Sequence, residues 1–94
     1  MDLRNYYDFE ELVNEAERLV IDELGRQLEK PENGDLLGNQ DLVRDIAAYA
    51  LNHVRPMYRA NLLGRLYAKA VDSEDVDEVE RAVTEAIKKI RDNP

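Results

Sequence analysis

Apolar residues recur at every third or fourth position along most of this chain, which is the pattern of amphipathic α-helices. The first stripe comprises Phe9, Leu12, Val13, Ala16, Leu19, Val20, Leu24 and Leu28. Asp8 is a good N-cap for this helix, and Glu11, three residues later, completes a capping box. We therefore predict a helix that starts at Asp8 and buries this stripe against a core.

A second helix is predicted from Asn39 or Gln40 to Val54. Before it, residues 29–38 contain Pro31 and an Asn-Gly pair, which favour a linker with a turn. Apolar residues cover much of the circumference of the second helix. We therefore expect this helix to be central and covered on several sides.

Two further helices complete the prediction, one that begins near Asn61 and one that follows Ser73. The last helix has acidic residues in its first turn and basic residues near its end, as the helix dipole favours. The sequence has no β-type runs of useful length. The predicted fold class is all-α, with about four helices in a single domain over residues 1–94. Since a chain this short has a marginal core, we expect a homodimer.

Charge is distributed unevenly along the chain, whose formal net charge is −8. Residues 1–38 carry 4 basic and 11 acidic side chains (net −7), residues 39–71 carry 5 and 2 (net +3), and residues 72–94 carry 4 and 8 (net −4). Overall acidity repels the phosphates of a nucleic acid polymer, so we expect no DNA or RNA partner. The positive middle third suits a small anionic ligand better.

The chain has no cysteine and one histidine, which excludes disulfides and leaves too few ligands for an ordinary zinc site. We therefore expect no metal and no cofactor. No apolar run approaches the length of a membrane span, and the N-terminus lacks the basic and apolar regions of a signal peptide. The default expectation is a cytoplasmic, bacterial-type protein with no membrane partner.

Catalytic signatures are missing from the sequence, and we expect that the protein is not an enzyme. Its many carboxylates lie on predicted solvated helix faces with nothing to perturb their pKa. His53, near the end of the second helix, is a candidate general base for a hydrolase. No nucleophile at a recognisable spacing supports that role, so a hydrolase is the weakest of the functions considered.

Four arginines surround the predicted junction between the second and third helices, namely Arg44, Arg55, Arg59 and Arg65. A guanidinium is always charged and grips a phosphate in two places. Tyr58, between two of these arginines, offers a ring that stacks on a nucleobase. These five residues are the predicted binding set for a small nucleotide. The alternative from spacing alone is that the arginines pair with carboxylates of the acidic first and fourth helices.

Asn52 lies on the largely buried second helix, so its amide is expected to be hydrogen-bonded. We predict that it bonds the backbone of the loop over residues 55–59 and fixes the shape of that loop. Pro56 terminates the helix and holds Arg55 extended. Asp45, on the same helix, is also assigned a structural role.

The segment DIAAYALNHVRPMY, from Asp45 to Tyr58, resembles the signature of the late competence development protein ComFB family. That signature reads Asp-Ile, then Ala-Leu-Asn, then a two-proline turn and a tyrosine. RNYYDFEELV near the start and GRLYA at residues 64–68 resemble other family segments, so the likeness spans most of residues 4–68. This chain differs in two features: Arg55 replaces the usual first proline, and the cysteines that many members carry before the aspartate are absent.

The resemblance implies a small all-α homodimer. Some members of the family are receptors for the cyclic dinucleotides cyclic di-GMP or cyclic di-AMP, so it also implies a regulatory protein with such a ligand. The zinc binding of the cysteine-bearing members is not carried over to this chain. The alternative is a ligand-free protein-interaction module, linked to competence, whose acidic helix faces bind a basic partner.

Overall fold

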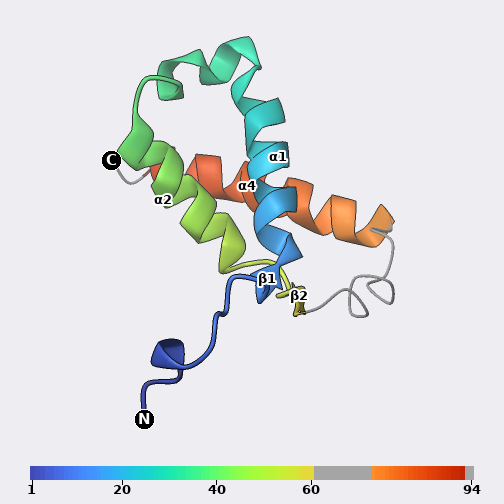
Figure 1. Cartoon of the computed structure of the whole chain (residues 1–94). Helices are drawn as coiled ribbons and strands as arrows, with labels where there is room; N and C mark the ends of the chain where they lie inside the picture. Colours follow the sequence, from blue (N-terminus) through green and yellow to red (C-terminus); the bar gives the residue numbers. More distant parts are fainter. Residues whose placement is uncertain (61–72, 93–94) are drawn as a thin grey trace.

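The computed structural model describes residues 1–60 and 73–92, where the chain is mostly helical with one small antiparallel sheet (Figure 1). In chain order the elements are the 3-10 helix η1 (Leu3–Asn5), β1 (Val13–Asn14), α1 (Glu15–Leu28), the 3-10 helix η2 (Pro31–Leu36), α2 (Gln40–Leu51), β2 (Tyr58–Arg59) and α4 (Ser73–Asp92). The mostly helical fold is confirmed, and the strands β1 and β2 correct the all-α prediction. The helix predicted from Asn61 lies outside the described residues.

Helix α1 begins at Glu15, well after the predicted start at Asp8. Its N-cap is Asn14, whose side chain accepts a hydrogen bond from the backbone N–H two residues further on (3.1 Å). Asp8 accepts a similar bond (2.8 Å), but in backbone that is not helical. The physical reason for the late start is the sheet, because pairing with β2 requires extended backbone at Val13 and Asn14.

Helix α2 starts where the sequence predicted, with Asn39 as its N-cap. It ends at Leu51, before the predicted end at Val54. The backbone has to leave the helix there to become extended at β2, and Pro56 disfavours helical backbone in the residue before it. Val54 is nevertheless buried, so it belongs to the core as expected.

The linker predicted over residues 29–38 is largely the short helix η2. Its Asn33 is buried, and the Asn33 amide donates to the carbonyl of Gln27 near the end of α1 (2.9 Å). From α4, the guanidinium of Arg91 bonds both carboxylate oxygens of Asp35 (2.8 and 2.9 Å). These contacts tie the linker to α1 and α4 and make it part of the folded body.

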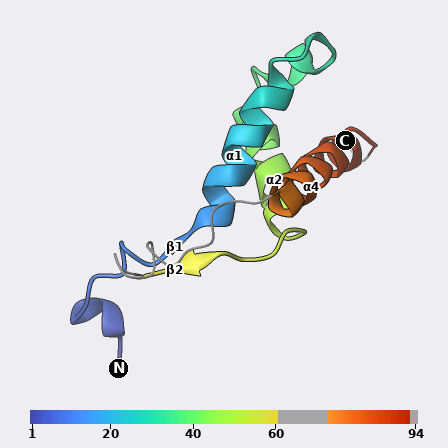
Figure 2. The same ribbon diagram turned by 90° about the vertical axis from the view of Figure 1, so that its right-hand side faces the viewer.

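Helix α4, which the structure describes from Ser73, packs against both α1 and α2, as the two views in Figures 1 and 2 show. The core lies where these three helices meet. Its buried apolar side chains are Ala16, Val20, Leu24, Leu28, Leu36, Ile46, Ala50, Val54, Val79, Ala82, Val83, Ala86 and Ile87. Phe9 and Leu12, which the helical pattern placed among the buried residues, are 44% and 50% exposed. The homodimer stays a prediction.

No helix among the described residues is long and apolar enough to cross a bilayer.

Candidate functional site

The segment from Asn52 to Arg59, which we call the α2–β2 turn, joins the helical core to the small sheet (Figure 1). Strand β2 pairs antiparallel with β1, so Arg59 lies opposite Val13 and Tyr58 lies opposite Asn14. The turn therefore carries three of the five residues that the sequence assigned to a ligand.

At the sheet end of the turn, Arg59 binds Glu15, the first residue of α1. The Arg59 Nε donates to Glu15 Oε1 at 2.7 Å, and Nη2 pairs with the same oxygen. The other carboxylate oxygen accepts from Arg18 Nε at 3.0 Å. Hydrogen bonds from Arg18 and Arg59 hold the pKa of Glu15 below its ordinary value. Since the Arg59 and Glu15 side chains are only 19% and 20% exposed, this pair is largely shielded from solvent.

The Arg59–Glu15 pair also determines where Tyr58 points. Successive side chains of a strand lie on opposite faces, so an Arg59 turned towards α1 leaves Tyr58 facing outward. Tyr58 is 65% exposed. The backbone adds a further link, because the Glu15 N–H donates to the carbonyl of Met57 at 2.9 Å. Arg59 therefore positions the end of the turn, and Tyr58 is its accessible residue.

At the helix end of the turn, Arg55 binds two carboxylates of α4. Its Nη2 lies 2.5 Å from Asp75 Oδ1, and its Nε lies 3.3 Å from Glu78 Oε2. The backbone N–H of Arg55 also donates to Glu78 Oε1 at 2.9 Å. The negative charges of Glu78 and Asp75 raise the pKa of the Arg55 guanidinium. The Arg55 side chain is 64% exposed, so the charged group stays accessible although it is paired.

The remaining predicted arginines do not join this arrangement within the described residues. Arg44 is exposed in the middle of α2, and it makes no hydrogen bond or ion pair with any residue that the structure describes. It precedes the last residue of α2 by seven positions, which is about 10 Å along the helix axis. Arg65 lies outside the described residues. Arg55 and Arg59 bind carboxylates of different helices, so the structure does not gather these arginines around one mouth.

The structural role predicted for Asn52 has to be corrected. Asn52 is exposed, and its Nδ2 donates to the carbonyl of Ala48 in the same helix (3.0 Å), not to the loop. The side chain that fixes the loop is Asn14, whose Oδ1 accepts from the backbone N–H groups of Ala16 (3.1 Å) and Met57 (2.8 Å). The sequence signal that was missed is an Asn directly before a helical stripe, an N-cap position.

Structural roles were also predicted for Pro56 and Asp45, and the structure bears on Pro56 alone. Pro56 lies between the C-terminal end of α2 and the start of β2, where the prediction placed a chain that has left the helix. Asp45 is exposed on α2 and makes no hydrogen bond with the described residues. Its structural role therefore stays a prediction.

An open depression of about 310 Å³ lies beside the turn, lined by His53, Glu78, Arg81, Ala82 and Glu85. The His53 ring stacks on Tyr49, with centroids 4.2 Å apart, and its Nδ1 lies 2.7 Å from the Tyr49 carbonyl oxygen. A carbonyl only accepts, so Nδ1 carries the proton in this bond. No group of three or more potential metal ligands occurs within residues 1–60 and 73–92.

A family model described as late competence development protein ComFB matches residues 13–94. This range includes the α2–β2 turn and all three helices that form the core. No curated protein matches the chain. No solved structure matches it either.

Proposed function

This chain belongs to the late competence development protein ComFB family, and on that premise we propose that it is a non-enzymatic regulatory protein that binds a cyclic dinucleotide, cyclic di-GMP or cyclic di-AMP. The observation that carries the proposal is the pair of exposed side chains on the α2–β2 turn. Arg55 offers an accessible guanidinium, and Tyr58, three residues later, offers an accessible ring. Phosphate recognition by arginine and base stacking on tyrosine are the two interactions such a ligand requires.

The state of Arg55 fits an exchangeable anion site. One of its partners, Glu78, is a partly exposed carboxylate, and ion pairs of this kind contribute little to stability, whereas the other partner, Asp75, is buried. A phosphodiester, whose single negative charge is shared by two non-bridging oxygens, competes with Glu78 for the donors of the Arg55 guanidinium. The backbone N–H of Arg55 remains bonded to Glu78 in that exchange, so the turn keeps its shape.

Arg59 has a different role in this proposal from the one that the spacing suggested. Its guanidinium is shielded and committed to Glu15, so a ligand would have to break a largely buried pair to reach it. We assign it to positioning Tyr58 and not to contact with the nucleotide. Arg44 remains in the predicted binding set because it is an exposed cation on α2. Arg65, which lies outside the described residues, remains in that set as a prediction from the sequence.

Isothermal titration calorimetry of the full chain tests the proposal, with cyclic di-GMP, cyclic di-AMP and a linear dinucleotide as titrants. We expect binding of a cyclic form, weakened about tenfold or more in Arg55→Ala and in Tyr58→Ala. Arg26→Ala is the matched control, because it removes another exposed, carboxylate-paired arginine near the opposite end of α1 from the sheet, and it should leave the affinity unchanged. Absence of heat with both cyclic forms at millimolar concentration would rule the receptor out.

A second candidate is the ligand-free protein-interaction module. The observation that favours it is that both arginines placed by the structure in the turn are already paired with carboxylates of the same chain. In that case Arg55 and Arg59 only join the helices, and the acidic faces of α1 and α4 are the binding surface. The calorimetric titration separates the two candidates, since only the receptor predicts nucleotide binding that Arg55→Ala weakens.

A further inference from the structure

The first twelve residues form an arm that extends from the helical body on the side of the small sheet, as Figures 1 and 2 show from two directions. Most of the large apolar side chains that are exposed in the described part of the chain lie on this arm. They are Met1, Leu3, Tyr6, Tyr7, Phe9 and Leu12, with exposed fractions from 44% to 101%. The others are scattered singly over α1, the linker, the turn and α4, so the arm is the main uncovered apolar surface.

The arm has local structure of its own and no bonds to the helices. The backbone N–H groups of Tyr6 and Tyr7 donate to the Leu3 carbonyl (3.0 and 2.9 Å), and the N–H of Leu12 donates to the Phe9 carbonyl (3.0 Å). Among the residues that the structure describes, no hydrogen bond or ion pair joins the arm to the helical body. The arm is therefore available to a partner without any rearrangement of the core.

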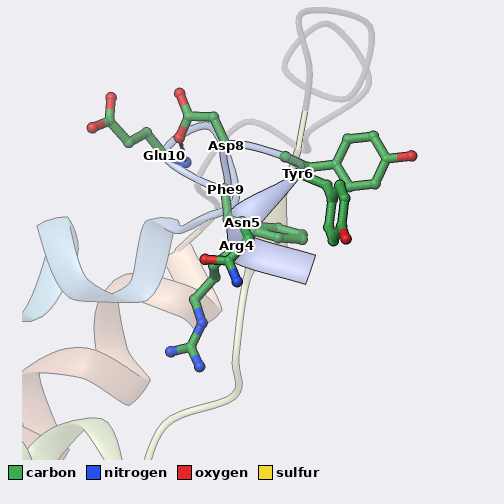
Figure 3. Close-up of a pocket in the computed structure, with 7 residues that line it drawn as sticks. Arg4, Asn5, Tyr6, Asp8, Phe9 and Glu10 are labelled. Atoms are coloured by element: carbon green, nitrogen blue, oxygen red, sulfur yellow. Dashed lines mark hydrogen bonds between the residues drawn. The ribbon is translucent and has the colours of Figure 1, made fainter. Parts of the chain in front are cut away.

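Carboxylates are interspersed with the apolar side chains of the arm. The Arg4 Nε donates to Asp2 Oδ1 at 3.1 Å, so these two charges compensate each other. Asp8, Glu10 and Glu11 make no ion pair with any described residue. In Figure 3 the Asp8 and Glu10 side chains point away from the Arg4 guanidinium, although all three residues line the same pocket. The arm therefore has an uncompensated negative charge beside its apolar surface.

These carboxylates restrict what can cover the apolar surface. Phe9 lies between Asp8 and Glu10 in the sequence, so a surface that buries the Phe9 ring also takes water from the neighbouring carboxylates. Losing that water is costly unless a cation replaces it. The partner must therefore supply Lys or Arg side chains at the edge of an apolar groove. Arginine meets both needs, because its guanidinium pairs with carboxylates and also stacks on tyrosine rings.

The same charge argues against the other occupants of an exposed apolar surface. Anionic lipids and nucleic acids repel the arm. A second copy of this chain has the same formal net charge of −8, and its Arg55 and Arg59 are already bound to carboxylates of their own chain. We therefore do not assign the predicted homodimer to the arm. A different protein with a basic, apolar groove meets both requirements.

We propose that the arm over residues 1–12 is a docking segment that binds a basic, apolar groove on a different protein. Its aromatic and aliphatic side chains fill the groove, and Asp8, Glu10 and Glu11 pair with Lys or Arg side chains at the edge of the groove. The proposal goes beyond both candidate functions and rests on neither, because the arm lies outside the α2–β2 turn and outside the acidic faces of α1 and α4.

Fluorescence anisotropy with three labelled peptides tests whether the full chain selects this chemistry. Each peptide has about 18 residues, enough for several helical turns. The first is an amphipathic helix of leucine and lysine, the second replaces each lysine by glutamate, and the third replaces each leucine of the first by serine. We expect the wild-type chain to bind the leucine–lysine peptide at least about tenfold more tightly than either of the others.

Two matched triple variants locate the apolar contact. The arm variant replaces side chains that are 70%, 44% and 50% exposed, namely Tyr6→Ser, Phe9→Ser and Leu12→Ser. The body variant replaces side chains that are 56%, 62% and 49% exposed, namely Ile21→Ser, Leu37→Ser and Val76→Ser. We expect the arm variant to weaken binding of the leucine–lysine peptide about 30-fold or more, and the body variant to weaken it less than about threefold.

A second pair of triple variants locates the ionic contact. The arm charge variant removes the unpaired carboxylates of the arm, with Asp8→Asn, Glu10→Gln and Glu11→Gln. The body charge variant removes exposed carboxylates elsewhere, with Glu17→Gln, Glu29→Gln and Glu74→Gln. Both variants change the net charge by the same amount, so only a local effect separates them. We expect about tenfold weaker binding of the leucine–lysine peptide by the arm charge variant and a change of less than about threefold by the body charge variant.

A fluorescent reporter keeps the test decisive if the serine variant of the arm does not fold. The chain has no tryptophan, so Tyr7→Trp introduces a single probe in the arm and Leu37→Trp a single control on the body. We expect the leucine–lysine peptide to shift the emission of Tyr7→Trp to the blue and to leave the emission of Leu37→Trp unchanged.

Absence of binding, or similar affinities for the three peptides, overturns the proposal. So do arm and body variants that weaken binding equally, and an arm probe that stays solvated when the peptide is bound. Sedimentation of the chain without peptide gives the last outcome. A wild-type dimer that the serine variant of the arm dissociates would show that a second copy covers the arm, and this result would also overturn the proposal.

Discussion

Arg55 and Arg59 lie four residues apart, but they hold the two ends of the α2–β2 turn in different ways. At the sheet end, Arg59 and Glu15 are both about 20% exposed, and the carboxylate also accepts from Arg18. At the helix end, the Arg55 side chain is 64% exposed, although one of its partners, Asp75, is buried. The same type of side chain therefore makes a shielded link at one end and an open one at the other.

The comparison shows that arginine spacing alone does not identify a ligand site. A cation becomes available to a ligand when its own group is solvated, because the ion pair that has to be exchanged is then weak. When both partners are shielded, removing one leaves an uncompensated charge, and the pair is structural. By this criterion Arg55 is the candidate ligand residue of the two. The predictions below test the difference, in order of decreasing effect.

The largest effect is expected from Arg59→Ala. This substitution leaves the shielded Glu15 carboxylate with one of its two guanidinium partners and releases β2 from α1. We expect the free energy of unfolding, measured by urea denaturation, to fall by about 2–4 kcal/mol, below the range for fully buried pairs because this pair is partly exposed. Arg18→Ala removes the other, 57% exposed partner of Glu15 and should cost about 0.5 kcal/mol or less. Equal losses in the two variants would contradict the distinction between the pairs.

The next largest effect is expected from Asn14→Ala. The Asn14 side chain is both the N-cap of α1 and the acceptor for the Met57 N–H, so its loss removes a cap and leaves a loop donor unpaired. We expect the free energy of unfolding to fall by about 1.5–3 kcal/mol. Asn39→Ala, which removes only the cap of α2, is the matched control, with an expected loss of about 1 kcal/mol. If both variants lose the same stability, the bond to Met57 contributes nothing.

The helix starts and the α2–β2 turn also show how far the sequence specifies the fold. The start of α2 was predicted correctly, because caps and periodicity are local signals. The start of α1 was predicted too early, since the sheet that displaces it pairs residues 13–14 with residues 58–59, a contact that no local pattern reveals. The turn was identified from its arginines, but their carboxylate partners lie on α1 and α4 and depend on the fold.

The pH dependence of stability should report on the sheet end of the turn. The pKa of Glu15 is lower in the folded chain than its ordinary value of 4.5, so the carboxylate stabilises the fold above that value. This contribution is lost as the pH falls through the lowered folded pKa, while the arginines stay charged. Between pH 6 and pH 3, we expect the free energy of unfolding to fall by roughly 1 kcal/mol less in Glu15→Gln than in wild type, allowing for solvent screening. Glu17→Gln, at an exposed position of the same helix, should leave the curve parallel to that of wild type.

A smaller effect is expected from Arg55→Ala on the stability of the chain without ligand. Its guanidinium is mostly solvated, and its backbone N–H keeps the bond to Glu78 after the substitution. We expect a decrease in the midpoint of thermal unfolding that is clearly less than that of Arg59→Ala. A decrease as large as that of Arg59→Ala would make Arg55 a structural residue and remove it from the binding site.

The smallest effect is expected from Asn52→Ala. The sequence predicts that this residue fixes the loop, which would make its loss costly. The structure gives it one bond, to the Ala48 carbonyl in its own helix, at an exposed position where water replaces the lost donor. We therefore expect the free energy of unfolding to change by about 0.5 kcal/mol or less. Asn14→Ala serves as the reference in the same denaturation series. If Asn52→Ala is as costly as Asn14→Ala, the exposed side of Asn52 is covered in solution, and a contact with a ligand or a second copy at the C-terminal end of α2 becomes the explanation to pursue.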